Sequence, residues 1–232
     1  MLPVRALLVD FDGTACLQDV SEMLLDAFGD PGWKAFDDAV DRGRVGLREA
    51  AGHQAAMLRG SREEMLGFAL DHAQLAPTFA PFVHWAEANG LPITLASDGF
   101  AMYLRPILER AGLGRLEVVT NVLAFENGHV RLRHPNAHPD CVGCGTCKML
   151  VASRLRDDHG PIAFIGEGQS DRYGAMYSDV VFAKDALVQI CEQDAVPFVR
   201  WETFDDVRSA LETMDEVPGP VGGALCPGWR KE

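Results

Sequence analysis

The first apolar run of the chain ends in two acidic residues. Val4–Val9 is typical of a short buried strand, because it is apolar, contains β-branched side chains and leads into a glycine turn. The letters D-F-D-G-T follow at 10–14, so Asp10 and Asp12 stand one residue apart at the end of that strand. Ligands of open α/β sheets bind outside the carboxyl ends of the strands, and buried acids are costly unless a cation or a proton holds them. The segment therefore indicates a metal-assisted active site.

Strands alternate with helices in the second part of the chain. Apolar runs at 91–96, 117–120, 162–165 and 180–183 are separated by helical patterns. This order predicts an α/β fold, a Rossmann-like doubly wound parallel sheet. A turn is expected at 97–99, and a hairpin is expected to turn at Asn127-Gly128.

Only helical patterns lie between the first strand and about residue 76. The fourth begins with Ser61 and Glu64, which form a capping box. We therefore expect an all-helical cap at 16–75, placed over the carboxyl end of the first strand, and a catalytic core made of 1–15 and 76–216. The Pro/Gly-rich segment 217–232 is expected to be a loose tail.

Composition narrows the class of partner. The 232-residue chain has a formal net charge of −13, which argues against nucleic acids and anionic membranes as partners. No apolar run is long enough to suggest a spanning helix, and no signal peptide is visible, so we expect a cytoplasmic protein. A small phosphorylated metabolite remains compatible, because one lysine and a metal ion override the global charge inside a pocket. The sequence predicts no oligomeric state.

Further polar groups at strand ends suit phosphoryl chemistry. Ser97 follows the strand at 91–96, Lys148 begins a helix, and the turn 166–171 contains Glu167 and Asp171. Mg²⁺ prefers hard oxygen ligands, which Asp10 and Glu167 supply. An ionised Asp10 is a candidate nucleophile, with Asp12 as general acid and base. Ser97 and backbone N–H groups are candidates for holding phosphate oxygens.

These motifs, in this order, resemble the haloacid dehalogenase superfamily of aspartate-nucleophile phosphatases. The resemblance covers nearly the whole chain and is strongest for the subgroup of phosphoserine phosphatase and the methionine-salvage phosphatase acting on a methylthiopentenyl phosphate. It implies hydrolysis of a small phosphomonoester through an aspartyl-phosphate, with a helical cap and Mg²⁺. The residues implied are the catalytic pair Asp10 and Asp12, the phosphate-binding set Ser97, Asp98, Gly99 and Lys148, and the metal-site set Asp10, Asp12 (through its carbonyl), Glu167 and Asp171.

Two positions depart from the family pattern. Glu167 stands where the family usually has Asp, which leaves open a rearranged metal site or a weakened, phosphate-ester-binding protein. Phosphoserine phosphatases carry a cap arginine for the substrate carboxylate, and Gln54 or a neighbour occupies that place here, with Arg48 or Arg59 as possible substitutes. The methylthiopentenyl phosphate is therefore the preferred substrate, and phosphoserine or another small amino-alcohol phosphate is the alternative.

Three cysteines cluster ahead of Lys148. Cys141, Cys144 and Cys147, together with His138, have the residue types for a tetrahedral structural Zn²⁺ site. The alternative is a loop of reduced thiols packed by its own residues. An iron–sulfur cluster is less favoured, because a fourth cysteine at a suitable spacing is missing.

Overall fold

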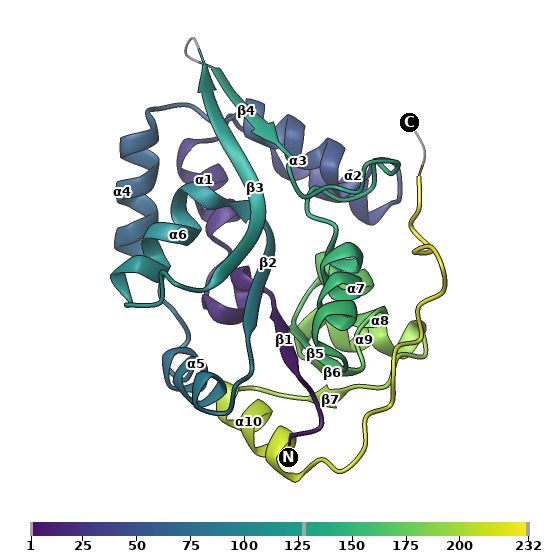
Figure 1. The fold of residues 1–232 in the computed structure, drawn as a ribbon. Coiled ribbons are helices and arrows are strands. Elements are labelled where there is room, and N and C mark those ends of the chain that lie inside the picture. The colour runs from purple at the N-terminus through teal and green to yellow at the C-terminus, as the bar shows by residue number, and fades with distance from the viewer. Residues whose placement is uncertain (1, 127–128, 231–232) are drawn as a thin grey trace.

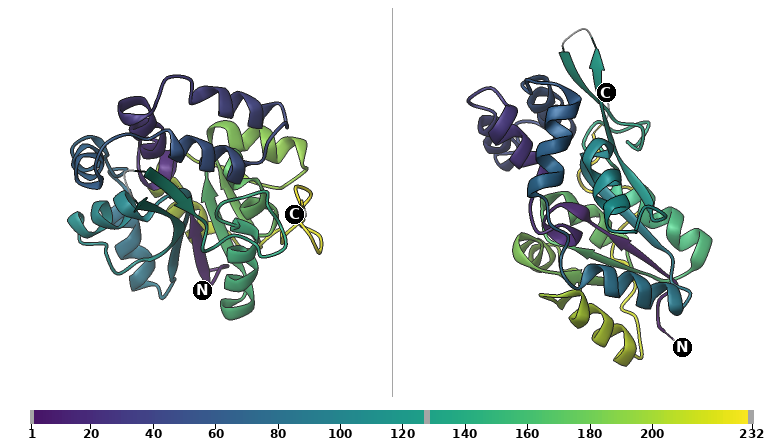
Figure 2. Two further views of the ribbon diagram at one scale, coloured as in Figure 1. Left: turned by 90° about the horizontal axis from the view of Figure 1, so that it is seen from above. Right: turned by 90° about the vertical axis from the view of Figure 1, so that its left-hand side faces the viewer.

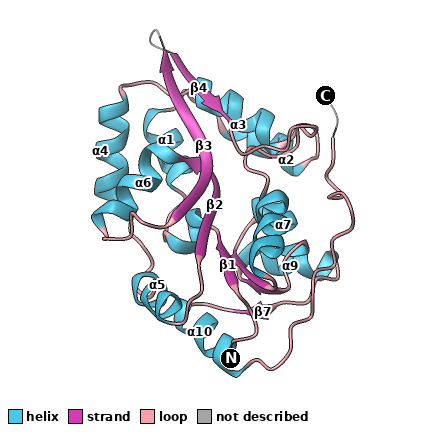
Figure 3. Ribbon diagram, viewed as in Figure 1, coloured by secondary structure: helices cyan, strands magenta, loops and turns pink. Residues whose placement is uncertain are grey.

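The fold is built on a single mixed sheet. The computed structural model describes residues 2–126 and 129–230. The strand order is β4-β3-β2-β1-β5-β6-β7, with only the β3–β4 pair antiparallel (Figures 1 and 3). The strands are β1 (Ala6–Val9), β2 (Ile93–Phe100), β3 (Glu117–Glu126), β4 (His129–Arg133), β5 (Ile162–Gly166), β6 (Val180–Ala183) and β7 (Val199–Arg200). The predicted α/β class is confirmed.

Helices cover both faces of the sheet. Leu7 and Val9 of β1 pack into the core shared with α5 (Phe79–Ala88), α6 (Ala101–Arg110) and α10 (Phe204–Thr213). The alternate residues Ala6 and Leu8 pack into the core shared with α7 (Lys148–His159), α8 (Arg172–Met176) and α9 (Asp185–Gln193). Because strand side chains alternate between faces, the continuous apolar run of β1 is buried on both sides. This double burial fixes the position of Asp10 at the end of the central strand.

Four helices are inserted between β1 and α5, beyond the carboxyl edge of the sheet (Figures 1 and 2). They are α1 (Val20–Phe28), α2 (Lys34–Asp41), α3 (Leu47–Ala56) and α4 (Arg62–His72), and α4 begins with the expected capping box. The chain entering and leaving the insert pairs at a neck, where Leu17 N donates to Gln74 O at 2.8 Å and Ala76 N donates to Ala15 O at 2.9 Å. Within the described residues, every helix falls short of the length and apolar character that a membrane span needs.

The structure departs from the expected turn at 97–99. Strand β2 continues through these residues to Phe100, and its register with β3 shifts between Ala96 and Phe100. Thr120 Oγ1 donates to Gly99 O at 2.7 Å and holds this bulged stretch against β3. A bulge re-aims the side chains of a strand, which brings Ser97 to the active-site edge. The expected strands of the hairpin form β3 and β4, and the turn at 127–128 lies outside the described residues.

The tail that we expected to be loose is docked on the core. From 217 to 230 it contains no helix or strand, yet Val221 N and Gly222 N donate to Met176 O at 3.0 and 2.8 Å. Farther on, Val142 N donates to Arg230 O at 3.2 Å, and Cys226 is buried. Hydrogen bonds to the core therefore replace the regular structure that the Pro/Gly-rich composition prevents (Figure 1, yellow).

Candidate active site

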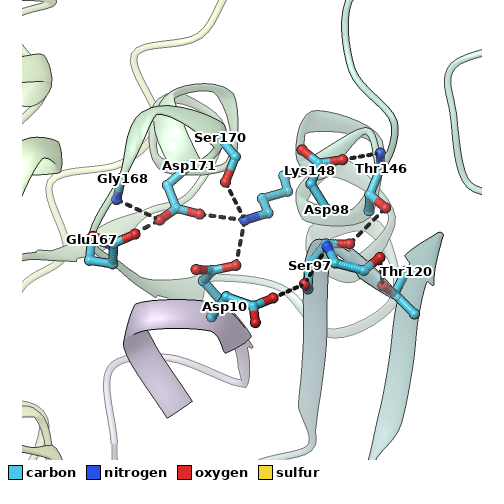
Figure 4. Close-up of polar contacts among 12 residues, drawn as sticks. Asp10, Ser97, Asp98, Thr120, Thr146, Lys148, Glu167, Gly168, Ser170 and Asp171 are labelled. Carbon is cyan, nitrogen blue, oxygen red and sulfur yellow. Dashed lines mark hydrogen bonds and ion pairs between the residues drawn. The ribbon is translucent and has the colours of Figure 1, made fainter. Parts of the chain in front are cut away.

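A buried lysine joins two of the predicted acids (Figure 4). Lys148 Nζ, at the start of α7, lies 2.6 Å from Asp10 Oδ1, 2.5 Å from Asp171 Oδ1 and 3.1 Å from Ser170 Oγ. Burial raises the pKa of Asp10 well above its ordinary value and Asp171 adds to this, although Lys148 opposes it. Burial alone lowers the pKa of Lys148, but the charges of Asp10 and Asp171 outweigh it and raise that pKa. The lysine therefore stays protonated and shares one positive charge between two carboxylates.

Asp12 lies in a different environment. Its Oδ1 accepts from Val20 N at 3.0 Å and its Oδ2 from Ser97 Oγ at 3.0 Å, while the Tyr103 hydroxyl lies 3.1 and 2.9 Å from the two oxygens. Burial, with help from the charge of Asp19, raises the pKa of Asp12 to about 7 against these donors. A carboxyl group with such a pKa exchanges a proton near neutral pH, as a general acid and base must. Sequence reasoning missed Tyr103, because a tyrosine on a helix face carries no motif.

Three acids meet in a group that suits a hard cation. Among the described residues, only Asp10, Glu167 and Asp171 place three ligand atoms within 4.8 Å of one another. Burial, followed by the charge of Asp171, raises the pKa of Glu167 to about 7, although Lys148 opposes this. Three carboxyl groups that share only one ammonium suit a divalent cation, and their oxygens match the ligand preference of Mg²⁺. The longer side chain of Glu167 fits because Gly13, beside it, has no side chain. A Cβ at position 13 would stand only 3.0 Å from Glu167 Cδ, and the φ of +70° there also favours glycine.

Three of the four predicted phosphate-binding residues, Ser97, Asp98 and Gly99, line one pocket with Asp10 and Asp12 and are held by local hydrogen bonds, whereas Lys148 lines a neighbouring small cavity. Ser97 Oγ, besides contacting Asp12, accepts from Gly99 N at 2.8 Å. Asp98 Oδ1 accepts from Thr146 N at 2.6 Å, and Thr146 Oγ1 donates to Ser97 O at 2.9 Å (Figure 4). These bonds tie the segment before Lys148 to the end of β2. Asp98 thus holds the segment that precedes Lys148 by a hydrogen bond. Its negative charge does not favour direct contact with phosphate.

A pocket of about 390 Å³ extends from these acids to the inserted helices. Gln54, in its wall, donates to Asp37 Oδ1 at 2.7 Å. Among the described residues, no arginine or lysine lines this pocket. Arg48 instead donates to Cys144 O and Cys141 O at 2.8 and 2.5 Å, and Arg59 bonds Asp30. The apolar part of the wall consists of Leu25, Trp33, Val40, Leu47, Ala50, Ala51 and Phe100.

The structure does not support the zinc site expected at His138, Cys141, Cys144 and Cys147. Within the described residues, these side chains do not bring three ligand atoms within 4.8 Å. The His138 ring packs edge-on against Trp229 with centroids 4.4 Å apart, and its Nδ1 accepts from Asp140 N at 3.1 Å. The histidine is therefore engaged in packing the loop, because its Nδ1 atom and its ring already have partners.

Comparison with known proteins finds similar sequences and similar folds. A model of haloacid dehalogenase-like hydrolases matches residues 7–176. A protein of Bacillus velezensis named 2-hydroxy-3-keto-5-methylthiopentenyl-1-phosphate phosphatase is 31% identical over 91% of both chains. A protein of Geobacillus kaustophilus with the same name is 30% identical over 91% of this chain and 97% of its own. A solved structure described as a phospho-aspartyl intermediate analogue of phosphoserine phosphatase has a similar fold, with TM-score 0.68 and 15% identity over 91% of this chain and 99% of that one.

Proposed function

Because this chain belongs to the haloacid dehalogenase-like hydrolase family and is a phosphatase, we propose that it hydrolyses a small phosphomonoester through an aspartyl-phosphate on Asp10. An oxygen of Asp10 forms a bond to phosphorus while the ester P–O bond breaks. Asp12 gives its proton to the departing alkoxide and then takes one from the water that attacks the aspartyl-phosphate. The pKa of Asp12, about 7, supports both roles near neutral pH.

The acid trio supports magnesium as the resident cation. We assign Asp10, Glu167, Asp171 and the main-chain carbonyl of Asp12 to its site. When bound, Mg²⁺ supplies positive charge that offsets the negative phosphate oxygens. The ammonium of Lys148 also supplies positive charge, and its contact with Asp10 places it beside the reacting carboxylate. Ser97 and Gly99 complete the proposed phosphate-binding wall.

The inserted helices support a substrate whose far end is apolar and carries no negative charge. The observation that carries this choice is the pocket wall, whose described residues include aliphatic side chains from α1, α2 and α3 and the rings of Trp33 and Phe100 but no cation for a substrate carboxylate. The acids Asp19, Glu22 and Asp37 line the same wall, which disfavours a carboxylate further. A methylthiopentenyl chain fits such a wall, and relatives of this chain carry that substrate in their names. We therefore propose a methylthiopentenyl phosphate as substrate, with residues 16–75 as the cap that excludes bulk water and the cytoplasm as the place of action.

The alternatives have weaker support. Phosphoserine carries a carboxylate, and the positions considered for its recognition are engaged elsewhere: Gln54 with Asp37, and Arg48 with the cysteine loop. A degraded, binding-only site is disfavoured because Glu167 lies within the acid trio and Gly13 leaves space for its extra methylene.

Asp10→Asn tests the mechanism. The variant loses the nucleophile, so hydrolysis of an aryl phosphate should fall by at least about a thousandfold, measured as phosphate release in magnesium buffer. Asp26→Asn, on the exposed side of α1, is the matched control and should retain activity. An active Asp10→Asn variant would exclude the covalent route.

The substrate is tested separately: kcat/KM for the methylthiopentenyl phosphate should exceed that for phosphoserine by about tenfold or more, and the reverse order would reject the substrate assignment.

A further inference from the structure

A fourth cysteine joins the three of the loop. Cys141, Cys144, Cys147 and Cys226 line one small cavity directly behind Lys148. Cys226 arrives from the docked tail, which lies beside the loop where Val142 N bonds Arg230 O. Three of the four residues are at most 7% exposed, and Cys144 is half-buried. The fold thus supplies the thiol that the local sequence lacks.

Backbone N–H groups point to sulfur around this cavity. Gly143 N and Arg230 N each lie 3.4 Å from Cys141 Sγ. Burial raises the pKa of Cys226, and the N–H of Gly228 acts in the opposite direction. Hydrogen bonds from N–H groups to sulfur tune thiolates that bind metal clusters. The loop and the tail therefore both present donors to the same group of sulfur atoms.

An unused donor also borders the cavity. Trp229 lines it, and the Trp229 Nε1 atom is buried without a hydrogen-bond partner among the described residues. The Tyr177 hydroxyl, which does not line the cavity, is also buried without a partner among the described residues; burial raises its pKa, and Cys226 and Cys147 add to this. An unsatisfied buried donor costs about 1 to 3 kcal/mol, so an acceptor in the cavity would remove a penalty. Thiolate and sulfide sulfurs are such acceptors.

The spacing distinguishes between possible occupants. The loop reads C-x2-C-x2-C, and the remote Cys226 is followed by Pro227. In bacterial ferredoxins, a C-x2-C-x2-C run and a remote cysteine followed by proline hold one [4Fe–4S] cluster. A single zinc ion with Zn–S bonds of about 2.3 Å needs sulfurs only about 4 Å apart. In the described part of the chain, no three of these sulfurs lie within 4.8 Å of one another, which favours a larger occupant.

We propose that the thiolates of Cys141, Cys144, Cys147 and Cys226 bind a [4Fe–4S] cluster that fastens the tail to the loop preceding Lys148. Four thiolates on such a cluster leave a net negative charge, and the guanidinium of Arg48 lines the cavity to balance it. Arg48 also donates to three carbonyls of the loop, those of His138, Cys141 and Cys144, so one cation serves both the loop and the cluster. The cluster's role is structural, and the proposal is independent of the phosphatase mechanism.

Anaerobic purification of the full chain tests this. We expect about four iron and four acid-labile sulfide per chain, with the Mössbauer spectrum of a cubane cluster. Cys226→Ser should lose most of the iron. Cys191→Ser, which changes a buried cysteine of α9 outside the cavity, should retain it. Circular dichroism checks folding, and Cys144→Ser, at the most exposed of the four, replaces Cys226→Ser if that variant does not fold.

Three outcomes would overturn the proposal. Less than about a tenth of an iron per chain after reconstitution with iron and sulfide would show that no cluster forms. About one zinc per chain in place of iron would assign a mononuclear site instead. Equal iron loss in Cys226→Ser and Cys191→Ser would show that the cavity is not the binding site. Protection of 222–230 from proteolysis in the iron-loaded chain, lost on iron removal, would further support the fastening role.

Discussion

The buried triad of Lys148, Asp10 and Asp171 makes stability depend on charge, and Lys148→Met tests this dependence. The substitution keeps most of the side-chain length but removes an ammonium that lies 2.6 and 2.5 Å from two carboxylate oxygens. The three side chains are 1%, 6% and 0% exposed, so water cannot replace the lost partner. Removal of one partner from a buried ion pair costs about 3 to 5 kcal/mol.

Urea unfolding in buffer without added divalent cations measures this loss. With a urea m-value of about 3 kcal/mol/M for a chain of this size, the midpoint should fall by about 1 to 2 M. Lys34→Met is the matched control, because Lys34 lies 3.2 Å from Asp26 with both side chains more than half exposed. An exposed pair contributes at most about 1 kcal/mol, so the control midpoint should move little.

The pH dependence separates charge from packing. Burial raises the pKa of Asp10 in the folded chain, above the ordinary aspartate value of about 3.9. A carboxyl group with a raised folded pKa stabilises the fold at low pH, and this contribution is lost as pH rises through the folded value. Loss of the ammonium raises the pKa of Asp10 further, so the deficit of Lys148→Met against the wild type should grow between about pH 5 and about pH 8. An equal deficit at both pH values, or one no larger than that of Lys34→Met, would refute the reasoning.

Two further predictions concern the reaction. Tyr103→Phe removes a donor 2.9 Å from Asp12 Oδ2, so the pKa of Asp12 rises above about 7 and the alkaline fall of kcat/KM moves to higher pH. A pH–rate profile on an aryl phosphate measures this shift, and an unmoved alkaline limb would show that Asp12 is not the acid. Glu167→Asp withdraws a carboxylate from the acid trio, so the half-saturating magnesium concentration should rise about tenfold. A magnesium titration measures it, and a faster enzyme with unchanged magnesium requirement would mean that glutamate weakens a site suited to aspartate.

Local patterns in the sequence were sufficient to predict β1, the start of α4 and the meeting of the three acids. The apolar run before Asp10 predicted the central strand, because burial on both faces leaves no polar position in it. The capping box at Ser61 predicted the start of α4, because both of its hydrogen bonds form between residues three apart. The meeting of Asp10, Glu167 and Asp171 also followed from sequence, since parallel strands bring their carboxyl ends to one edge.

What the sequence did not reveal depends on contacts between distant segments. The stretch 97–99 has turn residues, yet Thr120 on β3 holds it in the sheet. The tail has the composition of a loose segment, but main-chain bonds to Met176 dock it. Its docking delivers Cys226 to a loop far away in the chain, and only the folded structure places this cysteine beside the other three. Tyr103 is equally hidden, because its contact with Asp12 forms only when α6 and α1 come together, where the Tyr103 and Ser21 hydroxyls lie 2.9 Å apart.

The charge balance of the site explains why substrate and magnesium binding should be coupled. Among the described residues, the site gathers four acidic side chains, Asp10, Asp12, Glu167 and Asp171, and the ammonium of Lys148 contacts only Asp10 and Asp171. Burial already holds the pKa of Asp12 and of Glu167 at about 7, so the site resists additional negative charge. A phosphomonoester brings such charge, and its binding becomes favourable only when a divalent cation enters the same group of acids. If that cation and Lys148 serve the phosphate as proposed, the distal pocket, which lacks a described cation and is lined by apolar side chains and by Asp19, Glu22 and Asp37, would recognise a remainder of the substrate that carries no negative charge.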